Sequence, residues 1–251
     1  MSIDLAAASP WLWVIAPLVV FAGYTVMGLT GFGSTMITVP ILAHFLPISF
    51  LVPLMAVIDV ACSLAIGGRG HKDIARGELM RLVPFMFVGF AIGVTVLVGV
   101  PDQYLRVALG IFAVGIGVHG IFNPTLQRSI SALWCVPAGI VGGAVATIFG
   151  AGGPFYAIYF SGRLRDKAAI RATASTLIFV SATSRAVIYA VTGLLLQLAT
   201  LIGVVFLAPF VWLGLRTGTR IHVGLSQEQM RRVIGAILVV TGLSLLARAF
   251  L

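Results

Sequence analysis

Long apolar stretches interrupted by few charges limit the fold of this chain more than any other feature of its sequence. A bilayer core of about 30 Å is crossed by roughly 20 apolar residues in an α-helix. Two shorter apolar stretches, 34–46 and 154–162, directly follow glycine-rich breaks. The sequence therefore predicts an all-α polytopic membrane protein with about eight long transmembrane helices and two short broken or re-entrant helices. The long stretches are 11–30, 48–68, 82–100, 104–123, 131–149, 172–193, 198–214 and 228–250.

The composition excludes a soluble globular domain. Of the 251 residues, 60% are hydrophobic and 9% are charged, whereas soluble domains carry roughly a quarter charged residues. The net charge of +9 does not indicate nucleic acid, because the basic residues separate apolar stretches and form no groove with aromatic stacking platforms. We therefore expect a lipid bilayer, and no nucleic acid, as the partner. Cys62 and Cys135 lie far apart in apolar stretches, which fits neither a disulfide framework nor a metal site.

The Lys and Arg residues between the stretches set the predicted orientation, since short loops rich in them stay on the cytoplasmic side. With the N-terminus outside, all of the 16 Lys and Arg residues except Arg106, Arg185 and Arg248 fall in inner loops. Each short stretch, paired with the long stretch before it, returns the chain to its starting side. Both termini are therefore expected outside. The first ten residues carry no Lys or Arg, so we expect no cleaved signal peptide.

The two halves of the chain resemble each other weakly. VGVPDQYLRVALG, ending at Gly110, and VGLSQEQMRRVIG, ending at Gly235, share a Val-Gly pair, an Arg and a final Gly at equal spacing. Each half also carries a glycine-rich break between a long and a short stretch. Residues 1–125 are expected outside-first and residues 126–251 inside-first, so we interpret them as two inverted-topology repeats of one transmembrane domain, as in many secondary transporters. Chance matching between glycine-rich apolar sequences is the alternative.

The glycine-rich breaks predict a binding site. A helix broken at membrane depth is tolerated only where it lines a cavity or packs in protein, because unsatisfied backbone groups cost several kcal/mol in hydrocarbon. Glycines permit each sharp turn, Ser34 and Thr35 are expected to supply helix-cap chemistry, and Pro154 suits the first helical turn. The glycines concerned are Gly28, Gly31 and Gly33 in the first break and Gly150, Gly152 and Gly153 in the second.

The chemistry of the breaks favours an anion. First-turn N–H groups of a helix carry about half a positive charge, and neither break contains an acidic residue. Hydroxyl groups flank the donors, so an oxyanion is favoured over a metal ion. The alternative is that the glycines only allow close helix packing. The hydroxyl groups belong to Thr30, Ser34, Thr35, Thr147 and Tyr156.

Two ionisable side chains fall inside predicted spans, where a charge is unfavourable by about 2.5 kcal/mol or more. Asp59 is interpreted either as a proton carrier that couples transport to the proton gradient or as a structural partner of Arg185. Arg185 is interpreted either as a substrate-binding residue, through its fork of donors, or as the partner of Asp59. A third alternative places Arg185 near the outer surface beside Tyr189, with its charged head reaching water.

The sequences GLTGFGSTMITVP and GAGGPFYAIYF resemble the paired glycine-rich motifs of the sulfite exporter TauE/SafE family, also called the 4-toluene sulfonate uptake permeases. The resemblance covers nearly the whole chain, and the first motif, with Val39-Pro40-Ile41-Leu42 behind it, is the more specific part. It implies transport of sulfite, sulfonates or related organosulfur anions across a bacterial inner membrane. The second motif departs from the pattern, with Pro154 directly after Gly153 and Tyr159 where a proline is expected.

A secondary transporter of a small sulfur-containing anion, working by alternating access, is therefore the predicted function. A carrier of another small anion, a cation exporter using Asp59, and a non-transporting membrane assembly subunit remain as alternatives. The sequence has no HExxH, no paired catalytic Asp and no nucleotide loop, so we expect neither an enzyme nor a cofactor or metal. A homo-oligomer is an alternative to a monomer.

Overall fold

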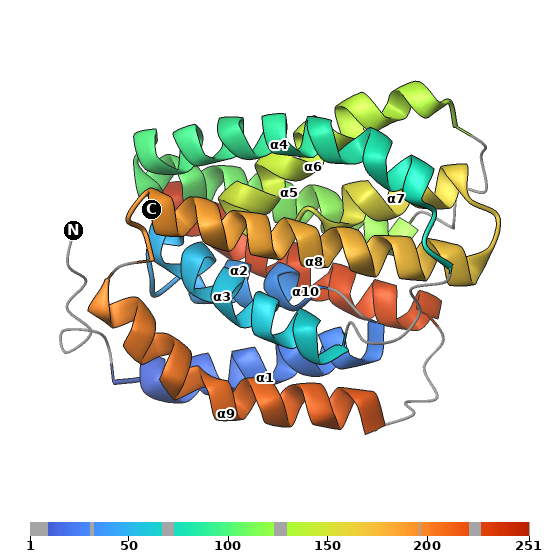
Figure 1. Ribbon diagram of the computed structural model, residues 1–251. Coiled ribbons are helices and arrows are strands. Elements are labelled where there is room, and N and C mark those ends of the chain that lie inside the picture. Colours follow the sequence, from blue (N-terminus) through green and yellow to red (C-terminus); the bar gives the residue numbers. More distant parts are fainter. Residues whose placement is uncertain are drawn as a thin grey trace. The chain divides into compact units, whose positions relative to one another are not determined.

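The computed structural model describes residues 10–30, 33–66, 73–122, 130–195, 197–220 and 227–250, and every regular element in these ranges is a helix (Figure 1). The elements in chain order are α1 (Leu12–Thr30), α2 (Ser34–Leu42), α3 (Ile48–Ile66), α4 (Arg76–Gly99), α5 (Asp102–Phe122), η3 (Ala132–Trp134), α6 (Cys135–Phe149), α7 (Gly153–Arg163), α8 (Lys167–Val191), α9 (Leu198–Arg220) and α10 (Gln227–Phe250).

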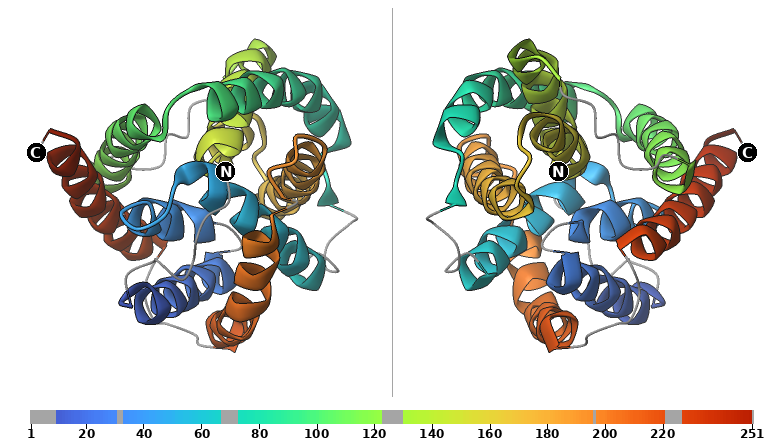
Figure 2. Two further views of the ribbon diagram at one scale, coloured as in Figure 1. Left: turned by 90° about the vertical axis from the view of Figure 1, so that its left-hand side faces the viewer. Right: turned by 90° about the vertical axis from the view of Figure 1, so that its right-hand side faces the viewer.

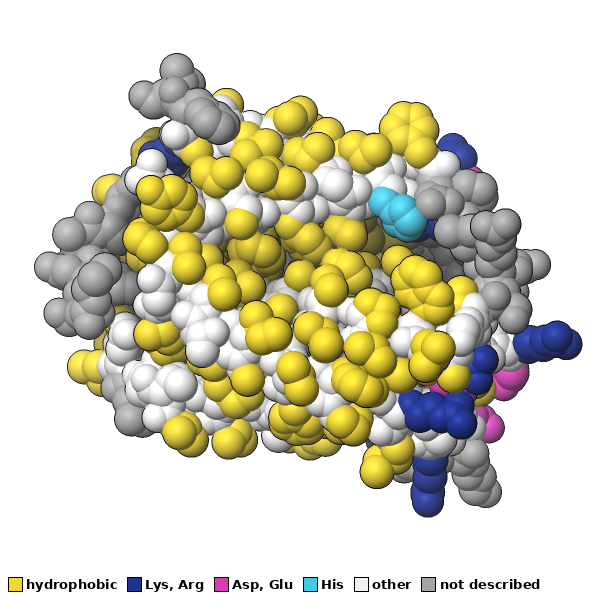
Figure 3. Space-filling view, turned by 90° about the horizontal axis from the view of Figure 1, so that it is seen from above, with side chains coloured by type: hydrophobic (Ala, Val, Ile, Leu, Met, Phe, Trp, Pro, Cys, Tyr) yellow, Lys and Arg dark blue, Asp and Glu magenta, His cyan; other side chains and the backbone are white. Residues whose placement is uncertain are grey.

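The predicted fold class is confirmed. In the part of the chain that the structure describes, seven helices are long and apolar enough to cross a membrane, and α3 is a shorter apolar helix. Large apolar side chains are exposed along these helices, as Phe122 (77%) and Val191 (83%) illustrate. Figure 3 shows hydrophobic side chains covering most of the face that it draws. Such large apolar areas are unusual on a soluble protein and suit contact with lipid.

The predicted boundaries are displaced where charged residues begin or end a helix. Helix α4 begins at Arg76 and α8 at Lys167, several residues before the apolar stretches that predicted them. The Asp166 carboxylate accepts hydrogen bonds from the N–H groups of Ala168 and Ala169, so it caps α8 in the polar region before the apolar residues start. Dividing the sequence at its charged residues therefore predicts helices that are too short wherever a helix extends beyond the bilayer core.

The helices form two compact units, and each unit takes helices from both halves of the chain. The first unit comprises Met1–Leu51, Val100–Pro124 and Gln197–Leu251. Within it α1 packs against α9 and α5 against α10, as both views of Figure 2 show, while the short helix α2 contacts α1 and α10.

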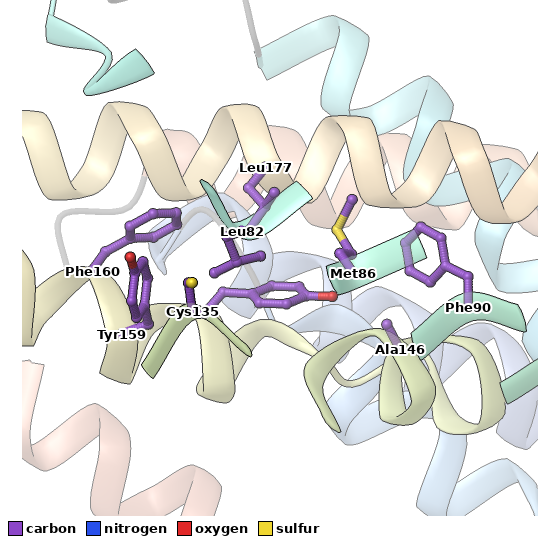
Figure 4. Packing of buried hydrophobic residues seen from close by; sticks show 9 residues of the cluster. Leu82, Met86, Phe90, Cys135, Ala146, Tyr159, Phe160 and Leu177 are labelled. Atoms are coloured by element: carbon purple, nitrogen blue, oxygen red, sulfur yellow. The ribbon is translucent and has the colours of Figure 1, made fainter. Parts of the chain in front are cut away.

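The second unit comprises Val52–Gly99 and Thr125–Leu196. Its main contact is between α4 and α6, and α7 packs against α6 and α8. The core of this unit gathers side chains from four helices (Figure 4): Leu82, Met86 and Phe90 from α4, Cys135 and Ala146 from α6, Tyr159 and Phe160 from α7, and Leu177 from α8. The short helix α7 is thus held by packing on several sides.

Glycines bring the paired helices into backbone contact. A Cβ atom added at Gly89 of α4 would lie 2.3 Å from the carbonyl oxygen of Ile140, and one added at Gly143 of α6 would lie 2.4 Å from that of Met86. In the first unit, a Cβ atom at Gly218 of α9 would lie 2.1 Å from the carbonyl oxygen of Thr25. Close approach through small residues is the usual basis of helix association in lipid.

The α4–α6 contact gives a first prediction. Gly89→Ala places its methyl group against backbone that cannot move aside, so we expect a loss of roughly 1–3 kcal/mol in the free energy of unfolding. Gly115→Ala is the matched control, because a Cβ atom there meets nothing within 4 Å. Thermal unfolding of the detergent-purified protein should give a lower midpoint for Gly89→Ala and an unchanged or slightly higher one for Gly115→Ala. Equal midpoints would contradict the assigned contact.

Candidate functional site

The second glycine-rich break separates α6 from α7. Helix α6 ends at Phe149, and Gly150 follows with a φ of 74° and donates its N–H to the carbonyl oxygen of Ala146 at 2.9 Å. This left-handed conformation favours glycine and commonly terminates a helix. Helix α7 begins three residues later at Gly153, with Pro154 in its first turn as the sequence predicts. The backbone therefore reverses within Gly150–Gly152.

The two ends of this broken pair meet. The N–H of Ile130, just before η3, donates to the carbonyl oxygen of Gly162 at 3.1 Å, and the Arg163 guanidinium donates to the carbonyl oxygen of Ile130 at 3.2 Å. Residues before α6 and at the end of α7 thus lie together. Helices α6 and α7 therefore form a hairpin whose two ends lie together and whose tip is the glycine-rich break.

Two side chains of α8 bind the backbone of α6 beside the break. The guanidinium of Arg185 donates to the carbonyl oxygen of Ala146 at 2.8 Å, and the hydroxyl of Tyr189 donates to the carbonyl oxygen of Thr147. The carbonyl oxygen of Ala146 also accepts the N–H of Gly150, so Arg185 adds a second donor there. Tyr189 supplies a donor to Thr147, one of the last carbonyls of the helix, which lack intrahelical partners and are costly to leave unpaired in lipid. Arg185 and Tyr189, one turn apart on α8, therefore stabilise the broken end of α6. This role of Tyr189 is a finding that the sequence analysis did not anticipate.

Asp59 of α3 and Arg185 of α8 form a buried ion pair. A guanidinium nitrogen of Arg185 lies 3.8 Å from a carboxylate oxygen of Asp59, and the two residues are 4% and 6% exposed respectively. Among the described residues no other charged side chain is buried. The structure thus pairs the two, as one of the alternatives proposed. It contradicts the alternative of Arg185 at the outer surface, since its side chain turns inward to the backbone of α6.

Two polar groups at this place have no hydrogen-bond partner. They are the Nε–H of Arg185 and the hydroxyl of Tyr156, which lies beside Ser181 without a hydrogen bond of good geometry. Tyr156 is 1% exposed, and burying an unsatisfied polar group is unfavourable by about 1–3 kcal/mol. Two buried donors without acceptors indicate a place for a ligand that brings its own acceptor atoms.

The glycines of the break shape this place. A Cβ atom at Gly152 would lie 2.5 Å from the carbonyl oxygen of Gly142 and 3.1 Å from the ring of Tyr156. One at Gly142 would lie 2.5 Å from the same ring. Tyr156 is therefore clamped between glycines of α6 and of the break.

The N-terminus of α7 offers fewer backbone donors than an ordinary helix start. Pro154 has no N–H, and the N–H groups of Phe155 and Tyr156 both donate to the carbonyl oxygen of Gly152. Backbone donors for a ligand at this end must therefore come from residues before Pro154. Side-chain donors consequently carry more of the predicted anion site than the helix end does.

The first break lies between α1 and α2, in the other compact unit. Gly33 is the N-cap residue of α2 with a φ of 96°, and no side chain caps the helix. The expectation that Ser34 and Thr35 supply the cap is therefore wrong: both are buried residues of the first turn. A φ of 96° strains any residue that has a side chain, so glycine and not a hydroxyl residue occupies this N-cap position. Gly31, Phe32 and the side chain of Thr30 lie outside the described residues.

The structure brings together only part of the predicted set of site residues. Those that share the second unit are Asp59, Gly150, Gly152, Gly153, Tyr156 and Arg185. Gly33, Ser34 and Thr35 belong to the first unit. Within the second unit the ionisable residues and the break form one site.

A polar cluster that the sequence analysis missed holds the other end of α7. The carboxylate of Glu78 in the first turn of α4 accepts hydrogen bonds from the guanidinium of Arg163, at 2.7 Å and 3.2 Å, and from the hydroxyl of Tyr159. Tyr159 is the residue that departs from the resembled motif. Its spacing of four from Arg163 puts both on one face of a helix, which is the signal that could have shown the cluster.

The described residues contain no group of three His, Cys, Asp or Glu side chains able to hold a metal ion. Cys62 and Cys135 are both free thiols and both buried. The site is thus built from an ion pair, phenol hydroxyls and a broken backbone.

Apolar spanning helices, a helix broken beside a buried ion pair, and unsatisfied interior donors are features of membrane transporters. The chain belongs to the Sulfite exporter TauE/SafE family, whose model matches residues 15–245. The family expected from the glycine-rich motifs is confirmed, and the chain is a multi-pass membrane transporter.

The chain is also similar to the probable inner membrane transporter protein TsaS of Comamonas testosteroni. The two are 25% identical over 199 residues, which cover 76% of this chain and 81% of that relative. No solved structure matches the chain.

The two buried tyrosines give a second prediction. Tyr189→Phe removes the donor to the carbonyl oxygen of Thr147, so we expect a loss of about 1–3 kcal/mol in the free energy of unfolding. Tyr156→Phe removes a hydroxyl that has no partner, so stability should stay the same or rise. Unfolding midpoints of both variants in one detergent test this contrast. A larger loss in Tyr156→Phe would show that its hydroxyl has a structural partner.

Proposed function

We propose that the protein is a secondary transporter of a small sulfur-containing anion, such as sulfite or a sulfonate, across the bacterial inner membrane. The observation that carries this proposal is the pair of buried donors, on Arg185 and Tyr156, that lack acceptors beside the α6–α7 break. The family and the transporter from Comamonas testosteroni support the same class of activity. Catalysis is not part of the proposal, since the residues of this site bind and do not form a nucleophile or a metal centre.

The donors suit an oxyanion better than a cation. A tetrahedral or pyramidal oxyanion presents several acceptor oxygens that can reach a guanidinium Nε–H, a phenol hydroxyl and backbone N–H groups together. A cation would need several oxygen ligands, but Asp59 is the only buried carboxylate among the described residues, and it faces Arg185. A cation exporter using Asp59 is therefore disfavoured.

Alternating access is supported by how the helices pair. If residues 1–125 and 126–251 are repeats, then α1, α4 and α5 correspond to α6, α9 and α10 in chain order. The contact of α1 with α9 then has its counterpart in that of α6 with α4, and α5 meets its own equivalent, α10. Each compact unit thus combines one repeat's broken pair with helices of the other repeat. Such an exchange of equivalent helices fits the inverted repeats on which many alternating-access transporters are built.

The proposed orientation places both termini outside and the loops rich in Lys and Arg in the cytoplasm. A reporter fused to the C-terminus tests it. We expect a C-terminal alkaline phosphatase to be active and a C-terminal green fluorescent protein to be dark. The reverse pattern would overturn the assigned orientation while leaving the site unaffected.

Transport itself is tested with the purified protein in proteoliposomes. We expect uptake of radiolabelled sulfite or ethanesulfonate by the wild type, and at least about a tenfold loss in Gly152→Ala, because its methyl group meets the backbone of Gly142 and the Tyr156 ring. Gly33→Ala should also lose activity, through strain at a φ of 96°. Gly115→Ala serves as the control that retains uptake. Undiminished uptake in both break variants would exclude a central role for the breaks.

Measuring anion affinity distinguishes a damaged binding site from a protein that has lost its fold. Removing the hydroxyl in Tyr156→Phe takes away a donor to the ligand without disturbing a protein hydrogen bond. We expect the Kd for the transported anion to rise by about 5- to 100-fold, corresponding to roughly 1–3 kcal/mol. Isothermal titration of the detergent-purified variant measures this. An unchanged Kd with a normal unfolding midpoint would place the anion elsewhere.

A further inference from the structure

We propose that Asp59 is the counter-ion of Arg185 when no substrate is bound. When Asp59 binds a proton, the Arg185 guanidinium becomes free to bind a monovalent anionic substrate. Proton and monoanion then cross together, and divalent anions are rejected. This inference rests on the proposed function and adds the charge of the substrate and the coupling ion. It follows from the charges that the structure buries at the site.

The ion pair is neutral and loosely joined. The distance of 3.8 Å between the guanidinium nitrogen and the carboxylate oxygen satisfies the charges but exceeds a hydrogen-bond distance. By contrast, Arg185 donates a true hydrogen bond of 2.8 Å to the carbonyl oxygen of Ala146. The guanidinium is therefore anchored to the backbone of α6, while its contact with Asp59 is the exchangeable one.

One of the two free donors lies on this same guanidinium and the other on Tyr156. The Nε–H of Arg185 and the hydroxyl of Tyr156 are buried and unpartnered while the Asp59 contact is in place. Neither donor takes part in the bond to Ala146, so an oxyanion that binds them leaves that bond intact. It would, however, add a negative charge to a buried and neutral site.

The charge balance of the buried site then determines which anions it can bind. With Asp59 ionised, a monoanion gives the buried site a net charge of −1, which is strongly unfavourable at membrane depth. When Asp59 takes a proton, Arg185 is left without a counter-ion, and a monoanion restores neutrality. A dianion leaves a charge of −1 even with the proton bound. Sulfonates and hydrogensulfite are monoanions, so they are the matching substrates, whereas sulfate is not.

Among the described residues, no other group at the site is suited to this role. The titratable groups that face the pair are Cys62 on α3, Tyr156 on α7 and Tyr189 on α8. Thiols and phenols are protonated and neutral at neutral pH. Asp59 is thus the group whose charge can change, and the proton it takes up on one side of the membrane leaves with the anion on the other.

The test compares two probes that differ by one sulfonate group, ethanesulfonate and ethane-1,2-disulfonate. Wild-type protein is reconstituted in proteoliposomes that contain a luminal pH dye. An inward ethanesulfonate gradient should acidify the lumen with about one proton per anion, and an imposed membrane potential should leave the initial rate unchanged, because the pair that crosses is neutral. Ethane-1,2-disulfonate should enter at least about tenfold more slowly.

Asp59→Asn isolates the carboxylate at nearly unchanged size. In this variant ethanesulfonate exchange across the membrane should continue, but without proton movement. Its Kd should not vary with pH, whereas that of the wild type should rise by about tenfold per pH unit once Asp59 is ionised. Asp59→Glu, which keeps an ionisable group, should restore proton movement. Size-exclusion profiles and unfolding midpoints identify a variant that has failed to fold, and the wild-type stoichiometry tests the proposal without any variant.

These experiments distinguish failure of this inference from failure of the proposed function. Uptake of ethanesulfonate by the wild type without proton movement, or equal uptake of the disulfonate, overturns the coupling and leaves the proposed transport function standing. Proton movement that persists in Asp59→Asn overturns the role of that residue. Absence of any sulfonate or sulfite flux in the wild type overturns the proposed function and this inference with it.

Discussion

The interaction on which the site depends is the pairing of α8 side chains with the backbone of α6 where that helix stops. A helix end inside a bilayer must find partners for its carbonyl groups, since lipid offers none. Tyr189 supplies one at Thr147, and Arg185 adds a second donor at Ala146, whose carbonyl oxygen also accepts the N–H of Gly150. Because Arg185 is held there, its remaining donors face the interior, and Asp59 is required nearby to balance its charge. The break, the ion pair and the unpartnered donors are consequences of one structural requirement.

Much of the fold follows from hydropathy alone. Each apolar stretch in the sequence corresponds to a helix, because a spanning helix must be apolar along its whole length, and the breaks are visible because only clustered glycines interrupt such stretches. The predicted helix boundaries were less accurate at Arg76 and Lys167, where α4 and α8 begin with polar turns that lie before the apolar stretch. The compact units were not expected from the sequence. The pairing of α4 with α6 depends on the absence of side chains at Gly89 and Gly143, and a hydropathy pattern does not show which helices pair.

The site was predictable to the extent that it contains residues out of place in lipid. Asp59 and Arg185 stand out as charges in apolar stretches, and their pairing was one of the alternatives that the sequence left open. The bond from Arg185 to a backbone carbonyl 39 residues away leaves no sequence pattern, since every residue offers the same carbonyl group. Ser34 and Thr35 misled for a related reason: hydroxyl residues before a helix predict a cap, but here the left-handed Gly33 takes that position.

The closed base of the α6–α7 hairpin has a consequence for how the protein is made. Ile130 and Gly162 lie within one hydrogen bond of each other, so the hairpin enters and leaves the bilayer at a single surface. During synthesis no hydrophilic loop of this segment has to be carried through the lipid. The cluster of Glu78, Tyr159 and Arg163 stays at the base with its charges paired. The tip of the hairpin, at 150–152, carries no charged side chain, so the charges of the pair lie at its base.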